Sequence, residues 1–244
     1  YVLTNPDTIS FKGEKEGSGE RPPVAASASR EFGDAEADTM PTSREEWRKF
    51  DVIILGDLPP DQLEDEVLQN VHYCVAERGA TLIIVTGPNY MPHGFRSPVL
   101  QELLPARYAH TDERLFLGPE KEFRMVLTSE GRLHPMMQLS ESSTENERVW
   151  NSLPVLRWRH PVEEVKPAAT ILAYAADPER SDRRRTVASA NLAEAARRME
   201  EFGELQRRNC LVVFQRYGRG KVVAMNTDRT WRFRHRVGDT HFHR

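Results

Sequence analysis

The sequence predicts an α/β protein built around a parallel strand–helix–strand unit and closed by a C-terminal hairpin. Val52–Leu55 and Leu82–Val85 are continuous apolar runs, which is typical of strands covered on both faces. Between them, apolar residues recur at the three- and four-residue steps of a helix, and short joints favour a parallel pairing of the two strands. Near the end, Leu211–Gln215 and Val222–Met225 flank Tyr217–Gly220, whose two glycines suit a tight hairpin turn.

Composition excludes several classes of protein. The 244 residues are 39% hydrophobic and 29% charged, which is neither collagenous nor wholly disordered. With 34 Lys and Arg against 37 Asp and Glu, the net charge of -3 is too balanced for binding nucleic acid through its phosphates. No apolar run approaches the roughly 20 residues of a membrane helix. The chain opens at Tyr1 without a signal peptide, and we expect it to be a piece of a longer protein.

The first elements can be predicted in chain order. Residues 12–42 are rich in Gly, Ser, Pro and charged residues and are predicted to form a mobile loop. Ser43 and Glu46 have the spacing of a capping box, which predicts a short helix anchored by Trp47 and Phe50.

A longer helix is predicted between the two buried strands. Asp61 is expected to cap it and Gly79 to end it. After the second strand, Ser97 and Pro98 predict another helix, with the hydroxyl as its cap and the proline in its first turn.

The second half is less regular. Arg124–Thr128 and Thr170–Ala175 are predicted strands, and Ser140–Arg148 is predicted to be a loop or one helical turn. Residues 179–209 are predicted to be a helical insertion, in which Asn191–Arg208 carries apolar residues along one face.

Ligands and catalytic groups of parallel sheets gather where the strands end, which directs attention to Thr86–Tyr90. A nucleophile elbow would place a serine or cysteine in this turn. Thr86 offers only a hydroxyl, Gly87 offers no side chain, and Pro88 removes an N–H that an oxyanion hole could use. The turn is therefore predicted to be structural.

The two cysteines do not replace the missing nucleophile. Cys74 lies on the apolar face of the predicted helix and is expected to pack in the core. Cys210 follows Arg207 and Arg208, surroundings that lower the pKa of a thiol, but no histidine lies nearby in sequence. We assign it to packing as well.

The C-terminal end combines histidines, arginines and aromatic residues. His235, His241 and His243 lie among arginines that would repel a cation, so no metal site is predicted. Residues 227–234 alternate aromatic residues with arginines directly after the last strand. They form either a rigid lip or partner surface, or an edge that closes the core against Trp231.

Several segments together carry a family resemblance. They are Phe50–Asp57, Arg78–Gly87, Leu103–Pro105, Leu127–Thr128, Glu130–Gly131, Lys166–Pro167, Ala169, Tyr217–Val222, Thr227–Asp228 and Trp231–Arg232. These segments, which cover Asp51 to about Phe242, resemble the class I glutamine amidotransferase-like domains of bacterial uncharacterised membrane proteins. The resemblance implies a single domain over residues 1–244, folded as a three-layer α/β/α sandwich with a mostly parallel, flavodoxin-like sheet. It also implies a membrane-anchored parent chain, often with a von Willebrand factor A-like domain, on an undetermined side of the membrane.

The departures from this family decide the functional prediction. Class I amidotransferases carry an elbow cysteine and a late His-x-Glu pair, and this sequence has neither. We therefore predict a non-catalytic module, without cofactor or metal, that binds a ligand, another domain of the same polypeptide or a protein partner. The candidate binding residues are Asp57, Thr86, Gly87, Pro88, Asn89, Tyr90, Asp228, Arg229, Trp231 and Arg232.

Two alternatives stay open. One is a hydrolase or amidotransferase with an unconventional nucleophile, in which Thr86 attacks and His93 is the base. The other is an architectural domain that only positions its neighbours, which predicts no ligand-shaped pocket at the strand ends.

Overall fold

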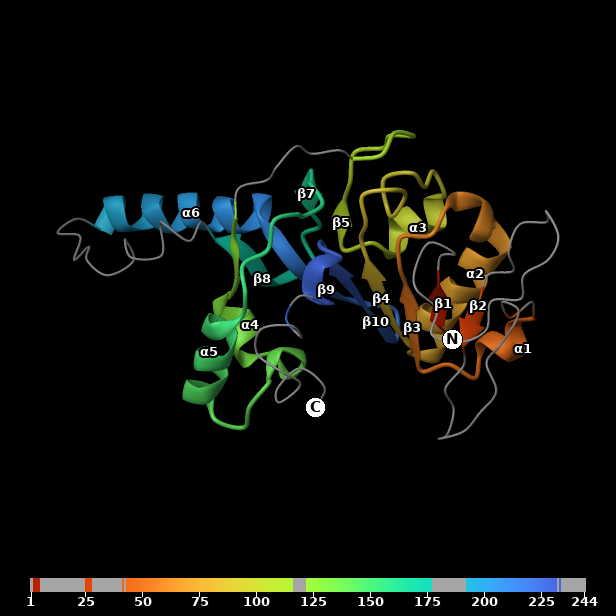
Figure 1. Ribbon diagram of the computed structural model, residues 1–244, viewed down its shortest axis with the longest axis horizontal. Helices are drawn as coiled ribbons and strands as arrows, with labels where there is room; N and C mark the ends of the chain where they lie inside the picture. The colour runs from red at the N-terminus through yellow and green to blue at the C-terminus, as the bar shows by residue number, and fades with distance from the viewer. Residues whose placement is uncertain are drawn as a thin grey trace.

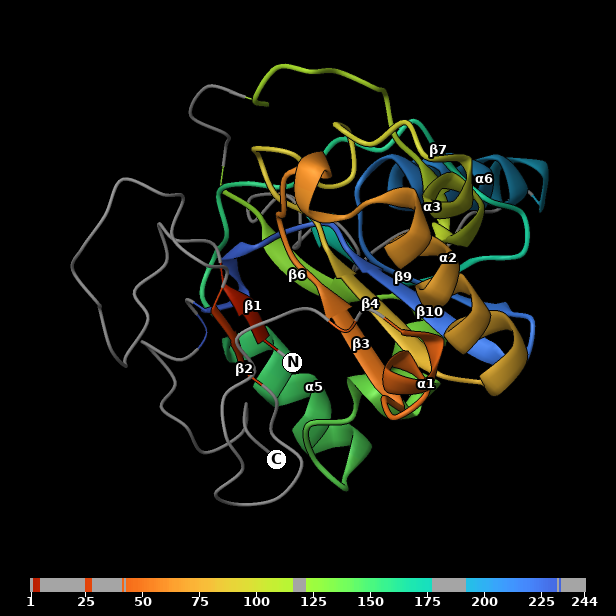
Figure 2. The same ribbon diagram turned by 90° about the vertical axis from the view of Figure 1, so that its right-hand side faces the viewer.

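The computed structural model contains one mixed sheet with helices on both faces, as Figure 1 and Figure 2 show from two directions. It describes residues 2–4, 25–27, 41, 43–115, 122–176, 192–231 and 233. The sheet has six strands, which are β3 (Val52–Leu55), β4 (Thr81–Val85), β6 (Arg124–Leu127), β8 (Thr170–Ala176), β9 (Cys210–Tyr217) and β10 (Gly220–Met225).

The strand order is β3-β4-β10-β9-β8-β6. β3, β4 and β10 are parallel to one another, whereas β10 with β9, β9 with β8, and β8 with β6 are antiparallel. Four of the six strands therefore point the same way, and the strands predicted around the central helix pair in parallel as expected.

Helices enclose the sheet from both sides. α2 (Asp65–Tyr73) and α3 (Pro98–Leu103) lie on one face, and α4 (Ser129–Leu133) and α5 (Ser143–Ser152) lie on the other (Figure 1, Figure 2). α6 (Leu192–Arg208) contacts β8 and then projects away from the body. The predicted three-layer α/β/α sandwich is confirmed.

Two apolar cores follow from this layering, because side chains alternate between the faces of each strand. Along β10, Val222 belongs to the first core and Val223 to the second. The first core lies under α2 and α3 and includes Leu55, Leu68, Val71, Leu82, Ile84, Leu100 and Leu103. The second lies under α4 and α5 and includes Met125, Leu127, Trp150, Leu153, Leu172, Val212 and Phe233.

The edge strand β3 differs from the prediction. Ile53 and Leu55 are buried, but Val52 and Ile54 are 53% and 54% exposed. Among the described residues, no helix covers the second face at this edge, because α4 and α5 lie under the opposite end of the sheet (Figure 1). The expectation that this run is covered on both faces was wrong.

The short helix α1 (Arg44–Trp47) has the predicted capping box. Glu46 N donates to Ser43 Oγ at 3.3 Å, and Ser43 N donates to Glu46 Oε2 at 3.1 Å. Trp47 is buried and donates its indole N–H to Pro41 O.

The helix between β3 and β4 is broken into three pieces. A 3₁₀ turn, η1 (Pro60–Gln62), precedes α2, and a π-helical turn, η2 (Cys74–Arg78), follows it. Asp61 lies inside η1 and does not cap α2, contrary to the prediction. Gly79, at φ +91°, ends the helix as predicted.

Two further helix predictions needed correction. α3 begins at Pro98, but the Ser97 hydroxyl makes no capping hydrogen bond. The segment Ser140–Arg148, predicted as a loop or one turn, belongs largely to the ten-residue helix α5. Val149 and Trp150 bury one side of this helix, and such tertiary packing stabilises a helix that its polar sequence does not favour.

The predicted hairpin of β9 and β10 is confirmed, with one change in the role of its glycines. Gly218 has φ +54°, but Gly220 is not in the left-handed region. Gly220 instead allows a close approach, because a Cβ there would lie 2.3 Å from Ala80 O and 2.5 Å from Val75 O.

The remaining elements are small. Within the predicted loop 12–42, only Pro41 and a short strand, β2, are described, and the rest lies outside the described residues. Of the predicted insertion 179–209, residues 179–191 also lie outside them. No described helix is long and apolar enough to cross a membrane. The short elements are β1 (Val2–Thr4), β2 (Ala25–Ser27), β5 (Ala106–Arg107), β7 (Glu164–Val165), η3 (Pro135–Met137) and η5 (Arg229–Trp231).

Candidate functional site

The candidate site lies at the carboxyl ends of the three parallel strands. Because β4 lies between β3 and β10, the residues that follow these strands meet at one edge of the sheet. Asp57 follows β3, Thr86–Tyr90 follows β4, and Asp228 follows β10. The predicted site residues that the structure describes are therefore brought together.

Asp57 organises the turn after β4. Its Oδ2 accepts hydrogen bonds from Asn89 N at 3.0 Å and Asn89 Nδ2 at 2.7 Å. Its Oδ1 accepts from Tyr90 N at 2.7 Å and Met91 N at 2.9 Å. Four donors thus bind one carboxylate, so Asp57 holds the turn and has little capacity left for a ligand.

Gly87 is required by the same contact. A Cβ at this position would lie 2.2 Å from Asp57 Cγ, whereas a Cβ at Gly56 would have no atom within 4 Å. The glycine that stands in the elbow position therefore admits a carboxylate, which supports the structural interpretation of the turn.

The end of β10 is fixed by buried polar contacts. Asn226 Oδ1 accepts from Tyr108 Oη at 2.7 Å, and Asn226 Nδ2 donates to Cys210 O at 3.1 Å. Thr227 Oγ1 donates to Trp158 O at 2.9 Å. The segment that carries Trp158 is thereby attached to the strand end.

Two buried histidines lie beside this edge. Both His93 and His160 are 1% exposed, and His93 Nδ1 lies 3.0 Å from His160 Nε2. At the outer ends of the pair, His93 Nε2 lies 3.2 Å from Asn89 O and His160 Nδ1 lies 2.7 Å from Pro161 O. The two rings therefore make three polar contacts in a row.

Three hydrogen bonds in this row need three protons, but two neutral imidazoles carry only two. Burial lowers the pKa of His93 and lowers the pKa of His160 to about 4, so both rings are neutral at pH 7. His160 then donates to Pro161 O and His93 donates to His160. The lone pair of His93 Nε2 is left facing Asn89 O, which is the longest of the three contacts.

Polar atoms without partners gather at the same strand ends. Among the described residues, the Thr86 hydroxyl and the Trp158 indole N–H are buried without a hydrogen bond. Their residues are 0% and 8% exposed. Buried polar groups are normally paired, and leaving one unpaired costs about 1–3 kcal/mol.

Asp228 adds a carboxylate to this group. Burial raises its pKa, and the charge of Asp57 adds to this effect, while Arg229 opposes it. Asp228 Oδ1 lies 3.2 Å from Arg229 Nε, yet it accepts no hydrogen bond of good geometry from the described residues. Asp228, Asn89 and Tyr90 are only half-buried, so the edge is open to solvent beside the buried groups.

The cysteines behave as predicted. Cys74 is fully buried in the first core, and burial raises the pKa of its thiol. Burial also raises the pKa of Cys210 to about 12, and its Sγ lies 3.5 Å from Asn226 Nδ2. Both remain uncharged thiols at neutral pH, which disfavours nucleophilic attack.

The geometry disfavours the alternative in which Thr86 attacks. His93 Nδ1 contacts His160 and His93 Nε2 faces Asn89 O, so neither ring nitrogen contacts the Thr86 hydroxyl. Thr86 Oγ1 makes no hydrogen bond to any described residue, so no base is in place to remove its proton.

Some predicted residues remain untested and some were missed. Trp231 lies in η5 without a described side chain, and Arg232, His235, His241 and His243 lie outside the described residues. Phe233 is buried in the second core. Sequence reasoning missed His160, Trp158, Tyr108 and Asn226. Asn226 directly follows a strand and could have been found from that position, but the other three come from irregular segments.

The described part of the chain holds no group of three His, Cys, Asp or Glu side chains that could bind a metal ion.

Comparisons with known proteins add little. No family model and no curated protein matches the chain. A cytoplasmic protein of Salmonella typhimurium, STM3548, is 17% identical with a TM-score of 0.49, over 78% of this chain and 65% of that one. The chain thus spans slightly less than two thirds of that protein. STM1381 from Salmonella typhimurium LT2 is 16% identical with a TM-score of 0.49, over 80% and 67%. Gan42B, a GH42 beta-galactosidase, is 13% identical with a TM-score of 0.39, over 75% and 20%.

Proposed function

We propose that this chain is a glutamine amidotransferase-like module without amidotransferase activity, which binds a small polar ligand at the ends of β4 and β10. The observation that carries the proposal is that Thr86 and Asp228, which follow β4 and β10, and Trp158, whose carbonyl is bonded to Thr227, all hold buried polar atoms without partners. A ligand that accepts from the indole N–H and donates to the carboxylate would satisfy them. A carboxamide has both an acceptor and donors, so it is the ligand class we favour.

The absence of catalysis rests on the state of the candidate nucleophiles. The two thiols are buried with raised pKa values, and Thr86 has no base in contact among the described residues. The resemblance of the sequence to domains of bacterial membrane proteins supports the further proposal that the module serves a larger, membrane-anchored polypeptide, whose other domains are the partners.

The ligand proposal can be tested with glutamine as the probe. We expect 10 mM glutamine to raise the melting temperature of the wild-type chain, with no rise in Asp228→Asn or Trp158→Phe. Trp150→Phe is the matched control, because the Trp150 indole already donates to Met137 O at 2.9 Å in the second core. An equal rise in all variants, or none in the wild type, would refute this ligand class at this site.

Two further measurements complete the test. Without ligand, Trp158→Phe should lower the free energy of unfolding less than Trp150→Phe does, because both remove the same ring volume but only Trp150 also loses a hydrogen bond. An equal or larger loss in Trp158→Phe would show that its N–H is already bonded. Ammonia release from glutamine above the level of Thr86→Ala would contradict the absence of amidotransferase activity.

A further inference from the structure

The outer edge of β6 carries the beginning of a further strand. Phe123 N donates to Leu156 O at 3.0 Å, and Leu156 N donates to Phe123 O at 2.9 Å. Main-chain groups of an antiparallel strand point alternately to its two neighbours. Those of Met125 and Leu127 therefore point to the same outer side as those of Phe123.

The inner side confirms this alternation. Thr128 N donates to Leu172 O at 3.0 Å, so Thr128, and with it Val126 and Arg124, faces β8. Within the described residues, no hydrogen bond reaches the main-chain N–H or C=O groups of Met125 and Leu127 from the outer side.

The sequence explains why the segment that pairs with Phe123 does not continue along β6. With Leu156 opposite Phe123, continued antiparallel pairing would place Pro154 opposite Met125. Proline has no N–H to donate, and the chain before it is the helix α5, which ends at Ser152. The added ladder therefore stops after one residue pair.

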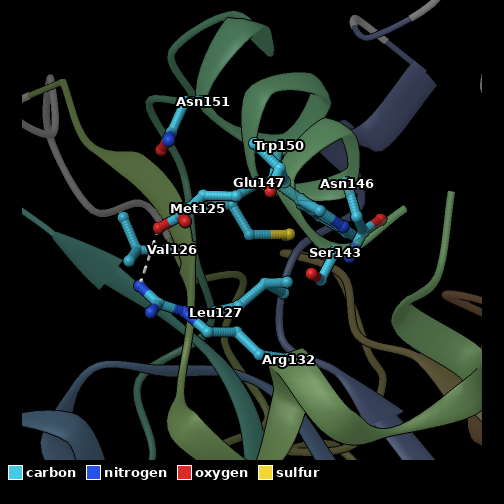
Figure 3. Close-up of a pocket in the computed structure, with 10 residues that line it drawn as sticks. Met125, Val126, Leu127, Arg132, Ser143, Asn146, Glu147, Trp150 and Asn151 are labelled. Atoms are coloured by element: carbon cyan, nitrogen blue, oxygen red, sulfur yellow. Dashed lines mark ion pairs between the residues drawn. The ribbon is translucent and has the colours of Figure 1, made fainter. Parts of the chain in front are cut away.

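A cavity of about 230 Å³ opens beside the unfilled positions, between β6 and α5 (Figure 3). Its buried lining consists of Met125, Leu127, Trp150 and Asn146, and its exposed lining is polar, with Arg132, Ser143, Thr144, Glu147 and Asn151. The ion pair of Arg132 Nη2 with Glu147 Oε1, at 3.1 Å, lies at its exposed rim. Such a cavity suits one unbranched or γ-branched apolar side chain.

We propose that β6 binds an extended peptide by strand addition, and that the cavity between β6 and α5 takes one apolar side chain of that peptide. Outward N–H and C=O groups in register are satisfied by another extended backbone, which identifies the occupant as a peptide strand. The four residues of β6 offer only about 13 Å of edge, which is too short for the roughly 1,000 Å² that a stable dimer needs. A linear segment of a partner protein therefore fits this edge better than a second copy of the chain.

The test uses the full chain and the capped peptide acetyl-Lys-Thr-Val-Leu-Val-Thr-Lys-amide. Two further peptides carry N-methyl groups, one on the odd-numbered and one on the even-numbered amides. Only alternate amides of an added strand face β6, so we expect one N-methylated peptide to lose at least tenfold in affinity and the other to bind almost unchanged. Fluorescence polarisation of labelled peptides measures this directly.

Protein variants give the matched experiment. Met125→Pro removes the outward N–H without touching the ladder to β8, while Met125→Ala removes the same side chain and keeps the N–H. We expect Met125→Pro to bind at least tenfold more weakly than Met125→Ala, and amide exchange at Leu127 to slow in the wild type with peptide.

Three outcomes would overturn the proposal. One is equal binding of all three peptides to the wild type, a result that does not depend on the folding of any variant. Another is unchanged exchange at Leu127 with saturating peptide. The last is a dimer in sedimentation that Met125→Pro abolishes, together with no peptide binding, because the occupant of the edge would then be a second copy.

Discussion

At the scale of single residues, the buried pair of His93 and His160 makes the strand edge sensitive to acid. When both rings are neutral, one of the three polar contacts of the pair has no proton between its two atoms. A third proton would turn that contact into a hydrogen bond. Desolvation opposes that proton in both rings. The charge of His110 lowers the pKa of His93, and that of His93 lowers the pKa of His160, whereas the Asp57 charge raises both pKa values. Desolvation has the largest effect, so the pKa of each ring lies below the ordinary value of 6.5, and that of His160 lies at about 4.

This predicts a loss of stability in mild acid. Histidines of the unfolded chain take up protons near pH 6.5, whereas His160 in the folded chain does so at about pH 4. The unfolded chain thus binds more protons between these values. The free energy of unfolding should be unaffected above about pH 6.5 and fall by about 3 kcal/mol down to about pH 4, where the contribution of His160 levels off.

Urea unfolding at a series of pH values measures this effect. In His160→Gln the part of the slope that belongs to this ring should disappear, whatever the stability of the variant at pH 7. An unchanged slope would mean that the ring is not desolvated as described.

At the scale of elements, the two described helical glycines distinguish a packed helix from a projecting one. Gly131 in α4 is buried, and a Cβ there would lie 1.9 Å from Leu172 O. Gly203 in α6 has only the end of the Arg207 side chain nearby, at 3.7 Å. The predicted apolar face of α6 is mostly open, since Met199 is 75% exposed.

The same substitution should therefore have opposite effects in the two helices. Gly131→Ala forces α4 away from β8 and should lower the free energy of unfolding by about 3 kcal/mol. Gly203→Ala should raise it by about 0.5–1 kcal/mol, because alanine favours the helix. Urea denaturation of the two variants side by side measures both, and a loss in Gly203→Ala would show that α6 packs against another part of the chain.

At the scale of the whole molecule, the sheet is covered unevenly. Among the described residues, α2 and α3 cover the first face along β3 and β4, whereas the second face is covered under β6 and β8 and not at β3 (Figure 1). Two neighbouring isoleucines of β3 differ in exposure for this reason, because Ile53 is 5% exposed and Ile54 is 54% exposed.

This unevenness predicts different costs for the same change. Ile53→Ala should lower the free energy of unfolding by about 2–4 kcal/mol, since it leaves a cavity in the first core. Ile54→Ala should cost less than about 1 kcal/mol. Equal losses in chemical denaturation would mean that another segment covers Ile54 in solution.

The sequence by itself determined the elements whose signals are local. Continuous apolar runs predicted β3 and β4, and two glycines between apolar segments predicted the hairpin of β9 and β10. The capping box predicted α1, and Gly79 predicted the end of the helix before β4. The absence of a cysteine from the turn after β4 could also be read directly from the sequence. These features depend on neighbouring residues, so a linear pattern contains them.

Tertiary structure decided what depends on contacts between distant segments. The exposure of Ile54, the packing of α5 through Trp150 and the hydrogen bonds of Asp57 to the turn after β4 all depend on such contacts. It also brought His160 and Trp158, from an irregular segment, to the strand ends. Burial and hydrogen-bond partners arise only when such segments meet, and for that reason no local pattern could predict this part of the site.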